Sequence, residues 1–146
     1  MRFLMLMIPA VYQPGADAGA ASGMPDAETV APMMRFNEEL KAAGALVALD
    51  GLHPLASGAR VSFKGGQPLV TDGPFAEAKE VIGGYWIIRT GSKAEAVEWA
   101  SRCPAAPGDV IEVRQIMDME DFPDAVVEAA RANAPELMAE MAPPKA

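Results

Sequence analysis

The chain has 146 residues, the usual length of one domain, and its 51% of hydrophobic and 22% of charged residues are typical of a globular protein. A net charge of −8 argues against nucleic acid as a partner, because phosphates are bound by clustered Lys and Arg. No stretch approaches the ~20 apolar residues of a transmembrane helix. The single cysteine, Cys103, cannot form an internal disulfide, which fits a reducing compartment. We therefore predict a cytoplasmic protein that binds neither nucleic acid nor membranes.

The N-terminal segment has two interpretations. Arg2, the apolar run Phe3–Val11 and the small residues at 16–18 mimic a short signal peptide. Pro9 interrupts that run, and Phe3–Ile8 is apolar on both alternating faces, which is typical of a central strand covered on both sides. We favour the strand.

A loop and a helix are predicted next. The residues from Gln13 to Pro25 are rich in Gly, Ala and Pro, which predicts a loop. A helix is expected from Asp26 to Ala43, with Gly44 as its left-handed C-terminal cap. Pro32 leaves two alternatives, a helix that begins at this residue or one that bends there. One stripe of the helix is apolar and consists of Met33, Phe36, Leu40 and Ala43.

A strand over Ala45–Leu52 precedes a predicted β-hairpin. Its arms are Arg60–Lys64 and Gln67–Thr71, joined by a two-residue glycine turn. This register places Val61 opposite Val70 and Phe63 opposite Pro68. Because proline cannot donate to a strand ladder, we expect the hairpin to lie at an edge.

The second half repeats the strand–helix–strand order. A strand is predicted over Val81–Thr90, and a capping box that begins at Ser92 starts a helix that ends before Pro104. The apolar side of this helix is formed by Ala96, Val97, Ala100 and Cys103. Val110–Ile116 is the last strand. An Ala- and Glu-rich helical segment follows Asp118 and is divided by Pro135.

The order of elements predicts a ferredoxin-like α+β sandwich, βαββαβ with an inserted β-hairpin, over residues 1–117, followed by a helical C-terminal extension over 118–146. Two helices can cover only one face of the sheet. The strands at Phe3–Ile8 and Tyr85–Ile88 are nevertheless apolar on both faces, and such a face needs a cover. We expect the sheet of a second subunit to provide it, which gives a face-to-face homodimer.

Two segments of the sequence carry a family resemblance. The segments "LVALDGLHP" and "VSFKGGQPLVTDGPFAEAKEVIGGYWII", within a match from Met1 to about Met117, closely resemble the DGPF subgroup of the YCII-related family. The resemblance implies a dimeric α+β barrel, members that look like small-molecule binders or enzymes, and a proposed catalytic His–Asp pair in a pocket. It also implies an association of some members with extracytoplasmic-function sigma factors. The segment beyond Asp118 lies outside the match.

The DGPF turn itself has a structural interpretation. Gly73 permits a backbone path that a side chain would block, Pro74 restricts that path, and Phe75 is expected to anchor the turn in apolar surroundings.

Three residues are predicted to carry acid–base chemistry: His53, Asp72 and Lys79. His53 is the only histidine, the residue type that exchanges protons near neutral pH, and it follows the end of a strand. Asp72 can orient His53, and Lys79 can turn inward and pair with Asp72. Each also has a structural alternative: a loop histidine next to Pro54, a turn-capping carboxylate and a solvated lysine, respectively.

Glu77, Tyr85 and Trp86 are predicted ligand-binding residues. Tyr85 and Trp86 alternate along a strand, so that one faces the helices and the other the dimer side. Core packing is the simpler role for both, and a pocket wall is the alternative. Glu77 belongs to the same charged run as Lys79.

Two functions fit these residues. In the first, an unknown small molecule binds between the sheet and the dimer partner, with acid–base catalysis as an addition. The alternative is a non-enzymatic regulatory or interaction protein associated with a sigma factor, which the amphipathic tail favours slightly. One His and one Cys give no zinc site of recognisable spacing, and we predict no cofactor and no metal.

Overall fold

The computed structural model describes residues 1–13, 27–75 and 80–141. Its strands are β1 (Arg2–Ile8), β2 (Leu46–Gly51), β3 (Ala59–Lys64), β4 (Gln67–Asp72), β5 (Gly84–Arg89) and β6 (Val110–Gln115). Its helices are α1 (Ala27–Ala42), α2 (Lys93–Ser101), α3 (Asp124–Asn133) and α4 (Pro135–Met141), with short 3₁₀ turns at Ala10–Tyr12, Leu55–Ser57 and Met119–Asp121. Apart from Gln13, the predicted loop Gln13–Pro25 lies outside the described residues.

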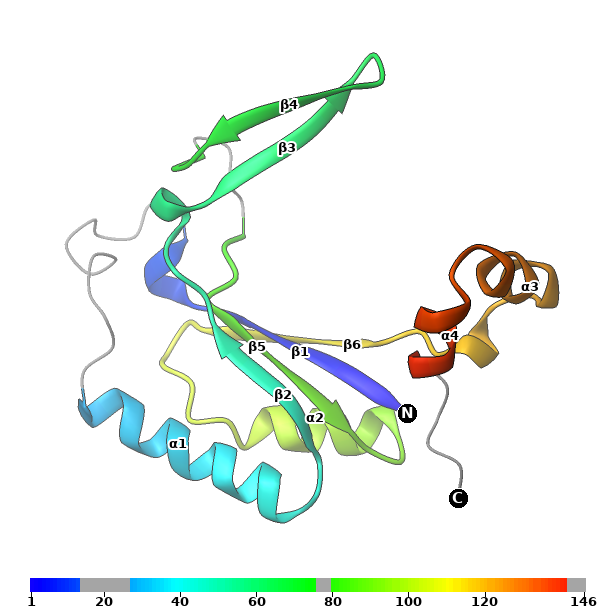
Figure 1. Cartoon of the computed structure of the whole chain (residues 1–146). Helices are drawn as coiled ribbons and strands as arrows, with labels where there is room; N and C mark the ends of the chain where they lie inside the picture. Colours follow the sequence, from blue (N-terminus) through cyan, green and yellow to red (C-terminus); the bar gives the residue numbers. More distant parts are fainter. Residues whose placement is uncertain (14–26, 76–79, 142–146) are drawn as a thin grey trace.

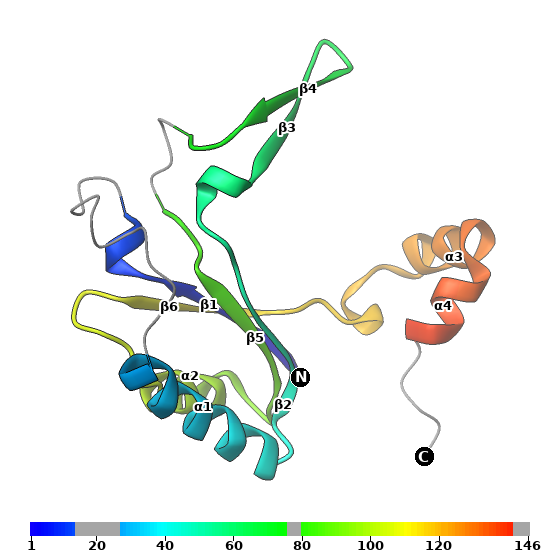
Figure 2. The ribbon, with the colours of Figure 1, turned by 60° about the vertical axis from the view of Figure 1, so that its left-hand side comes forward.

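Four strands form an antiparallel sheet in the order β2-β5-β1-β6, and α1 and α2 cover one of its faces (Figures 1 and 2). This α+β arrangement is compatible with the predicted ferredoxin-like fold. The register between β2 and β5 shifts between Leu46 and Ala48, which marks a β-bulge in this edge strand.

The hydrophobic core lies between the sheet and the two helices. Phe3, Met5 and Ile88 from the sheet meet Phe36 and Leu40 from α1, and all five are almost fully buried. A fully buried side chain of this size contributes about 1.5–3 kcal/mol. The core is therefore the main source of stability for this layer.

Trp86 brings a polar group into the core. Its indole N–H donates a 2.8 Å hydrogen bond to Oδ1 of Asn37, and both residues are buried. The ring also packs edge-on against Phe36, with centroids 6.1 Å apart. Asn37 was not among the predicted core residues, because an amide on an otherwise apolar stripe gives no sign that a partner lies across the interface.

The predictions for α1 are confirmed in part. Gly44 has a φ of 69°, as expected of a left-handed cap. Pro32 lies inside the helix, so the alternative in which the helix begins there is wrong. Ala43 is exposed and does not continue the buried stripe, because the helix ends at Ala42. The predicted cap of α2 is present, since Ser92 Oγ accepts a 3.2 Å hydrogen bond from the backbone N–H of Glu95.

The hairpin has the predicted register but not the predicted place. Val61 pairs with Val70 and Phe63 with Pro68, and the turn glycines Gly65 and Gly66 have φ of 59° and 79°. However, β3 and β4 form a separate two-stranded sheet, so the expected position at an edge of the main sheet is wrong. The chain leaves the main sheet through the 3₁₀ turn Leu55–Ser57, which directs the hairpin away from the body (Figure 1).

The DGPF turn closes the base of the hairpin. The backbone N–H of Gly73 donates a 2.8 Å hydrogen bond to the carbonyl of Gly58, and a Cβ at residue 73 would lie 1.8 Å from the carbonyl oxygen of Leu55. The predicted need for a glycine is thus explained by backbone contact. Phe75 is only half-buried and stacks under the Arg60 guanidinium, 4.0 Å from the ring centroid. Its surroundings are less apolar than expected.

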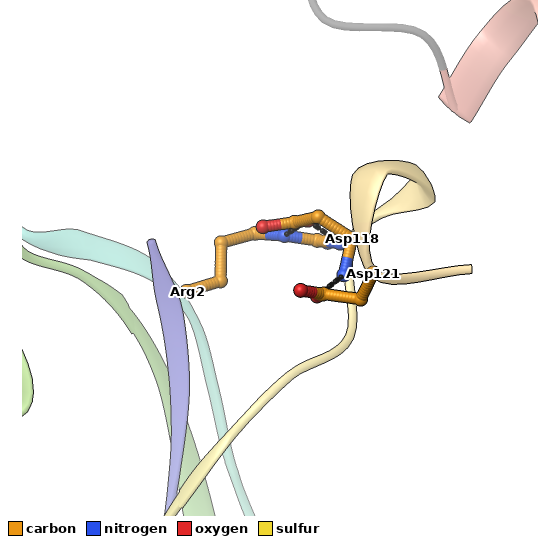
Figure 3. Close-up of polar contacts among 3 residues, drawn as sticks. All are labelled: Arg2, Asp118 and Asp121. Carbon is orange, nitrogen blue, oxygen red and sulfur yellow. Dashed lines mark hydrogen bonds and ion pairs between the residues drawn. The ribbon is translucent and has the colours of Figure 1, made fainter. Parts of the chain in front are cut away.

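An ion pair fixes the direction in which the chain leaves β6. The Arg2 guanidinium donates two hydrogen bonds to Oδ1 of Asp118, from Nε at 3.0 Å and from Nη2 at 2.6 Å (Figure 3). The Asp118 backbone N–H donates in turn to Oδ2 of Asp121, at 2.7 Å. Beyond this turn, α3 and α4 stand clear of the sheet (Figures 1 and 2).

The first testable prediction concerns the Trp86–Asn37 hydrogen bond. Asn37→Ala should lower the free energy of unfolding by about 1–3 kcal/mol, because it leaves a buried indole N–H without an acceptor. Urea denaturation followed by tryptophan fluorescence measures the change. Asn133→Ala, which removes an exposed amide bonded only to its own helix, is the matched control. Equal losses for the two variants would show that the buried bond contributes nothing particular.

The second prediction concerns Gly73. Gly73→Ala should loosen the base of the hairpin, because its Cβ would overlap the backbone of Leu55. Amide hydrogen exchange at residue 73 should accelerate as the bond to Gly58 is lost. Gly51→Ala is the control, since nothing lies within 4 Å of a Cβ added there. Unchanged exchange in Gly73→Ala would contradict the contact.

Candidate functional site

The face of the main sheet turned away from α1 and α2 is the candidate site. Because Phe3 and Met5 point to the helices, their neighbours Leu4 and Leu6 point to the other side. We call this side the open face. By register it comprises Arg2, Leu4, Leu6, Ile8, Ala48, Asp50, Tyr85, Ile87, Arg89, Val110, Glu112 and Arg114.

The centre of the open face is apolar. Leu4, Leu6 and Ile87 are half-buried and adjacent in the register, and Ile8 is buried. No helix among the described residues covers these three half-buried side chains, since α1 and α2 lie on the opposite side (Figures 1 and 2). The centre of the open face is therefore an apolar floor that no helix covers within the part of a single subunit that the structure describes.

A tyrosine–carboxylate pair stands at one edge of this floor. Tyr85 and Asp50 are directly paired across β5 and β2, and the Tyr85 hydroxyl donates a 2.9 Å hydrogen bond to Oδ2 of Asp50. This bond, and then the negative charge of Asp50, raise the pKa of Tyr85 above its ordinary value. Like any tyrosine phenol, Tyr85 is protonated at neutral pH, and because its O–H is donated to Asp50 its oxygen offers a ligand only lone pairs, which can accept a hydrogen bond.

Charged side chains surround the rest of the floor. Arg2 and Arg89 are cross-strand neighbours, and Asp118 offsets this like-charge pair by binding Arg2. Glu112 and Arg114 form a looser ion pair on β6, with Nε and Oε1 separated by 3.6 Å. The open face thus combines an apolar centre with a polar rim, the composition typical of small-molecule sites.

The structure places His53 and Asp72 at the same end of the molecule as Tyr85. His53 follows β2 directly after Leu52, whose backbone N–H bonds to Gly83, and Asp72 ends β4 at the base of the hairpin. Both side chains are exposed. Within the described residues, no hydrogen bond or ion pair joins them. The predicted His–Asp pair is not formed in the single chain.

The other predicted site residues lie elsewhere. Glu77 and Lys79 are outside the described residues. Trp86 is on the helix side, 6% exposed and bonded to Asn37, which is the core role that was its simpler interpretation. Tyr85 occupies the opposite side, so the predicted alternation of the two aromatic residues is confirmed.

A shallow groove of about 360 Å³ lies between α2 and β6. Its lining is formed by Lys93, Val97, Ala100, Ser101, Ile111 and Val113. It holds none of the predicted site residues and no pair of groups suited to proton transfer. It therefore adds nothing to the candidate site.

Cys103 is not a nucleophile in this structure. Burial raises the pKa of its thiol to about 11, and the charge of Asp109 adds to the shift. The thiol is therefore protonated at neutral pH, and its Sγ lies 3.9 Å from the sulfur of Met33. Among the described residues no group of three or more His, Cys, Asp or Glu is gathered in a way that could hold a metal ion. In that same part of the chain, no helix is long and apolar enough to cross a membrane.

Sequence reasoning missed Asp50 as a site residue. The sequence did contain a signal for Asp50. It shares one face of its strand with Ala48, and it directly precedes Gly51-Leu52-His53, where a site residue was already predicted. Its pairing with Tyr85 depends on the register between β2 and β5, and the bulge between Leu46 and Ala48 alters that register. A strand register that is counted from the sequence alone does not include such a shift.

Comparison with known proteins identifies the family of the chain. The YCII-related domain matches residues 1–120 of the chain. An uncharacterized protein from Rhizobium meliloti (strain 1021) is 29% identical over 96 residues, which cover 66% of this chain and 77% of that protein. The match of the domain over most of the sequence shows that the chain belongs to the YCII-related family.

Proposed function

We propose that the protein is a homodimer of the DGPF subgroup that binds a small molecule between the open face and its partner, with acid–base chemistry at the hairpin end. The observation that carries the proposal is the Tyr85–Asp50 pair, which presents a protonated phenol beside an apolar floor. A ligand with a flat apolar part and a polar group fits this combination.

The need for a partner follows from the same face. Leu4, Leu6 and Ile87 have no helix above them in the described ranges 1–13, 27–75 and 80–141, and burial of apolar surface stabilises by about 25 cal/mol per Å². A second open face related by two-fold symmetry offers an equally apolar and equally large surface. The open faces of the two subunits then enclose one binding site between them.

The acid–base groups come from the end of the sheet where Tyr85 lies. His53 and Asp72 are exposed there, and Asp50 is three residues before His53 in the chain. In the proposed dimer these groups, together with Lys79, act on the polar part of the ligand. Tyr85, whose one O–H is donated to Asp50, positions that part by accepting a hydrogen bond.

One observation favours the alternative of a regulatory or interaction protein. α3 and α4 stand clear of the sheet, and none of the described residues of α3 is buried. Such a segment can dock on another protein, a sigma factor being the partner that the family resemblance suggests. In that function the Tyr85–Asp50 pair would have no ligand, so loss of the pair would leave partner binding unchanged.

The third prediction tests the dimer. Sedimentation at micromolar concentration should give two chains per particle, and Leu4→Glu should give monomers because it places a charge on the apolar floor. Val97→Glu is the control, since this exposed residue lies on α2, away from the open face. A monomeric parent protein, or an equal effect of Val97→Glu, would contradict the open-face interface.

The fourth prediction tests the Tyr85–Asp50 pair. In a Tyr12→Phe background Tyr85 is the remaining tyrosine, and the ultraviolet absorbance of its tyrosinate should report a pKa above 10.0. Asp50→Asn should lower that pKa, because both the charge and the stronger acceptor are lost. An unchanged titration would show that the bond is absent in solution.

Ligand binding by the pair can be tested with a fragment library that contains aromatic amides, alcohols and carboxylates, observed by NMR. Fragments that bind the parent protein should bind Tyr85→Phe about tenfold more weakly, the effect of one lost hydrogen bond. Tyr12→Phe is the matched control. If no fragment distinguishes Tyr85→Phe from the control, the proposed site is wrong.

A further inference from the structure

Arginine side chains gather on the open face at the end away from the hairpin. Arg2 and Arg89 are directly paired across β1 and β5, and Arg114 of β6 is paired with Leu4, the next open-face residue of β1. Like charges that stand directly opposite each other destabilise a sheet. In a protein of net charge −8, such a gathering of cations is a feature that needs an explanation.

Two of these three guanidinium groups have a carboxylate partner. Arg2 binds Asp118 (Figure 3), and Nε of Arg114 lies 3.6 Å from Oε1 of Glu112. Arg89 is exposed, and within the described residues its side chain forms neither an ion pair nor a hydrogen bond. In that part of the chain, the guanidinium of Arg89 is thus available to an anion from outside.

The apolar floor connects the arginine end to the Tyr85–Asp50 pair. Arg89, Ile87 and Tyr85 lie on the same side of β5, and Leu4 is beside Ile87 in the register. Arg89 and Tyr85 are about 13 Å apart along the strand, at roughly 3.4 Å per residue. A ligand on this floor therefore meets a cation at one end and, at the other, a phenol oxygen that can only accept a hydrogen bond.

We infer that the ligand of the open face is a flat, apolar carboxylate with a hydrogen-bond donor at its far end. The carboxylate binds Arg89, with Arg2 beside it. The apolar body lies on Leu4 and Ile87, and the donor bonds to the Tyr85 oxygen. The inference rests on the proposed function and deepens it, because it names the chemical class of the small molecule.

A carboxylate suits the arginine end better than a doubly charged phosphate. A guanidinium presents its N–H donors in a plane that matches the two oxygens of a carboxylate. Arg2 already binds a carboxylate at this end, that of Asp118. The negative charge of Asp118 opposes a second negative charge on the ligand. One charge on the ligand is therefore the better match for the one available guanidinium.

Matched probes test the ligand class in NMR titrations of the full-length protein. The probes are a hydroxybiphenyl carboxylate with its polar groups at opposite ends, and the primary amide and the phosphate of the same skeleton. The parent protein should bind the carboxylate about fivefold more tightly than the amide, as expected of an exposed ion pair. Arg89→Gln should remove this preference by weakening the carboxylate alone. Arg35→Gln is the control and should keep the preference, because Arg35 is exposed on α1, on the other side of the sheet.

Tyr85→Phe separates the inference from the proposed function. This variant should weaken the carboxylate and the amide equally, because both probes carry the hydroxyl donor. Equal binding of carboxylate and amide to the parent, or no binding of either, would overturn the inference. The proposed function would still stand if other fragments respond to Tyr85→Phe. If no fragment responds to Tyr85→Phe, both proposals are wrong.

Two further outcomes would also overturn the inference. Tighter binding of the phosphate than of the carboxylate would show that the site takes a doubly charged group. Loss of the dimer in sedimentation of Arg89→Gln, without any probe, would show that the partner of Arg89 is a carboxylate of the second subunit. We expect the carboxylate to bind more tightly than the phosphate, and Arg89→Gln to sediment as the parent does.

Discussion

Strands β1 and β5 carry apolar side chains on both faces, whereas helices cover only one face of the sheet in the part of the chain that the structure describes. This mismatch governs the rest of the structure. The covered side becomes a core around Phe3, Met5 and Ile88, and the other side is left as the open face. Of the residues that we assign to a site, every one that the structure describes lies on that open face or at its hairpin end. The site therefore lies on the face of the sheet that does not contribute to the hydrophobic core.

Two consecutive aromatic residues of β5 have different roles: one stabilises the core, and the other belongs to the candidate site. Trp86 and Tyr85 each combine a large ring with one polar group, and each finds an acceptor on a neighbouring element. The acceptor of Trp86 is a neutral amide inside the core, where a charge would be costly. The acceptor of Tyr85 is a carboxylate at the surface, where charge is tolerated and shifts a proton equilibrium. Alternation along one strand is enough to separate these roles.

The sequence predicted the elements well because periodicity and turn residues act locally. The hairpin register follows from two glycines with positive φ, and the α2 cap from Ser92 and Glu95. The site was harder to predict. Asp50 meets Tyr85 only through a register that contains a bulge, and Asn37 meets Trp86 across the interface between helix and sheet. Neither contact leaves a pattern in its own segment. His53 and Asp72 stand out by residue type, yet residue type does not reveal whether two side chains meet.

The edges of the sheet bear on how copies of this protein can associate. β2 carries a bulge between Leu46 and Ala48 in its ladder with β5, and β6 alternates the charged Glu112 and Arg114 with apolar residues. Both are features that discourage a foreign strand from adding to an unpaired backbone. Stacking through the face is a closed operation that ends at two copies, whereas addition at an edge can continue into open-ended fibres. The protein therefore combines one apolar face with edge strands that discourage open-ended association.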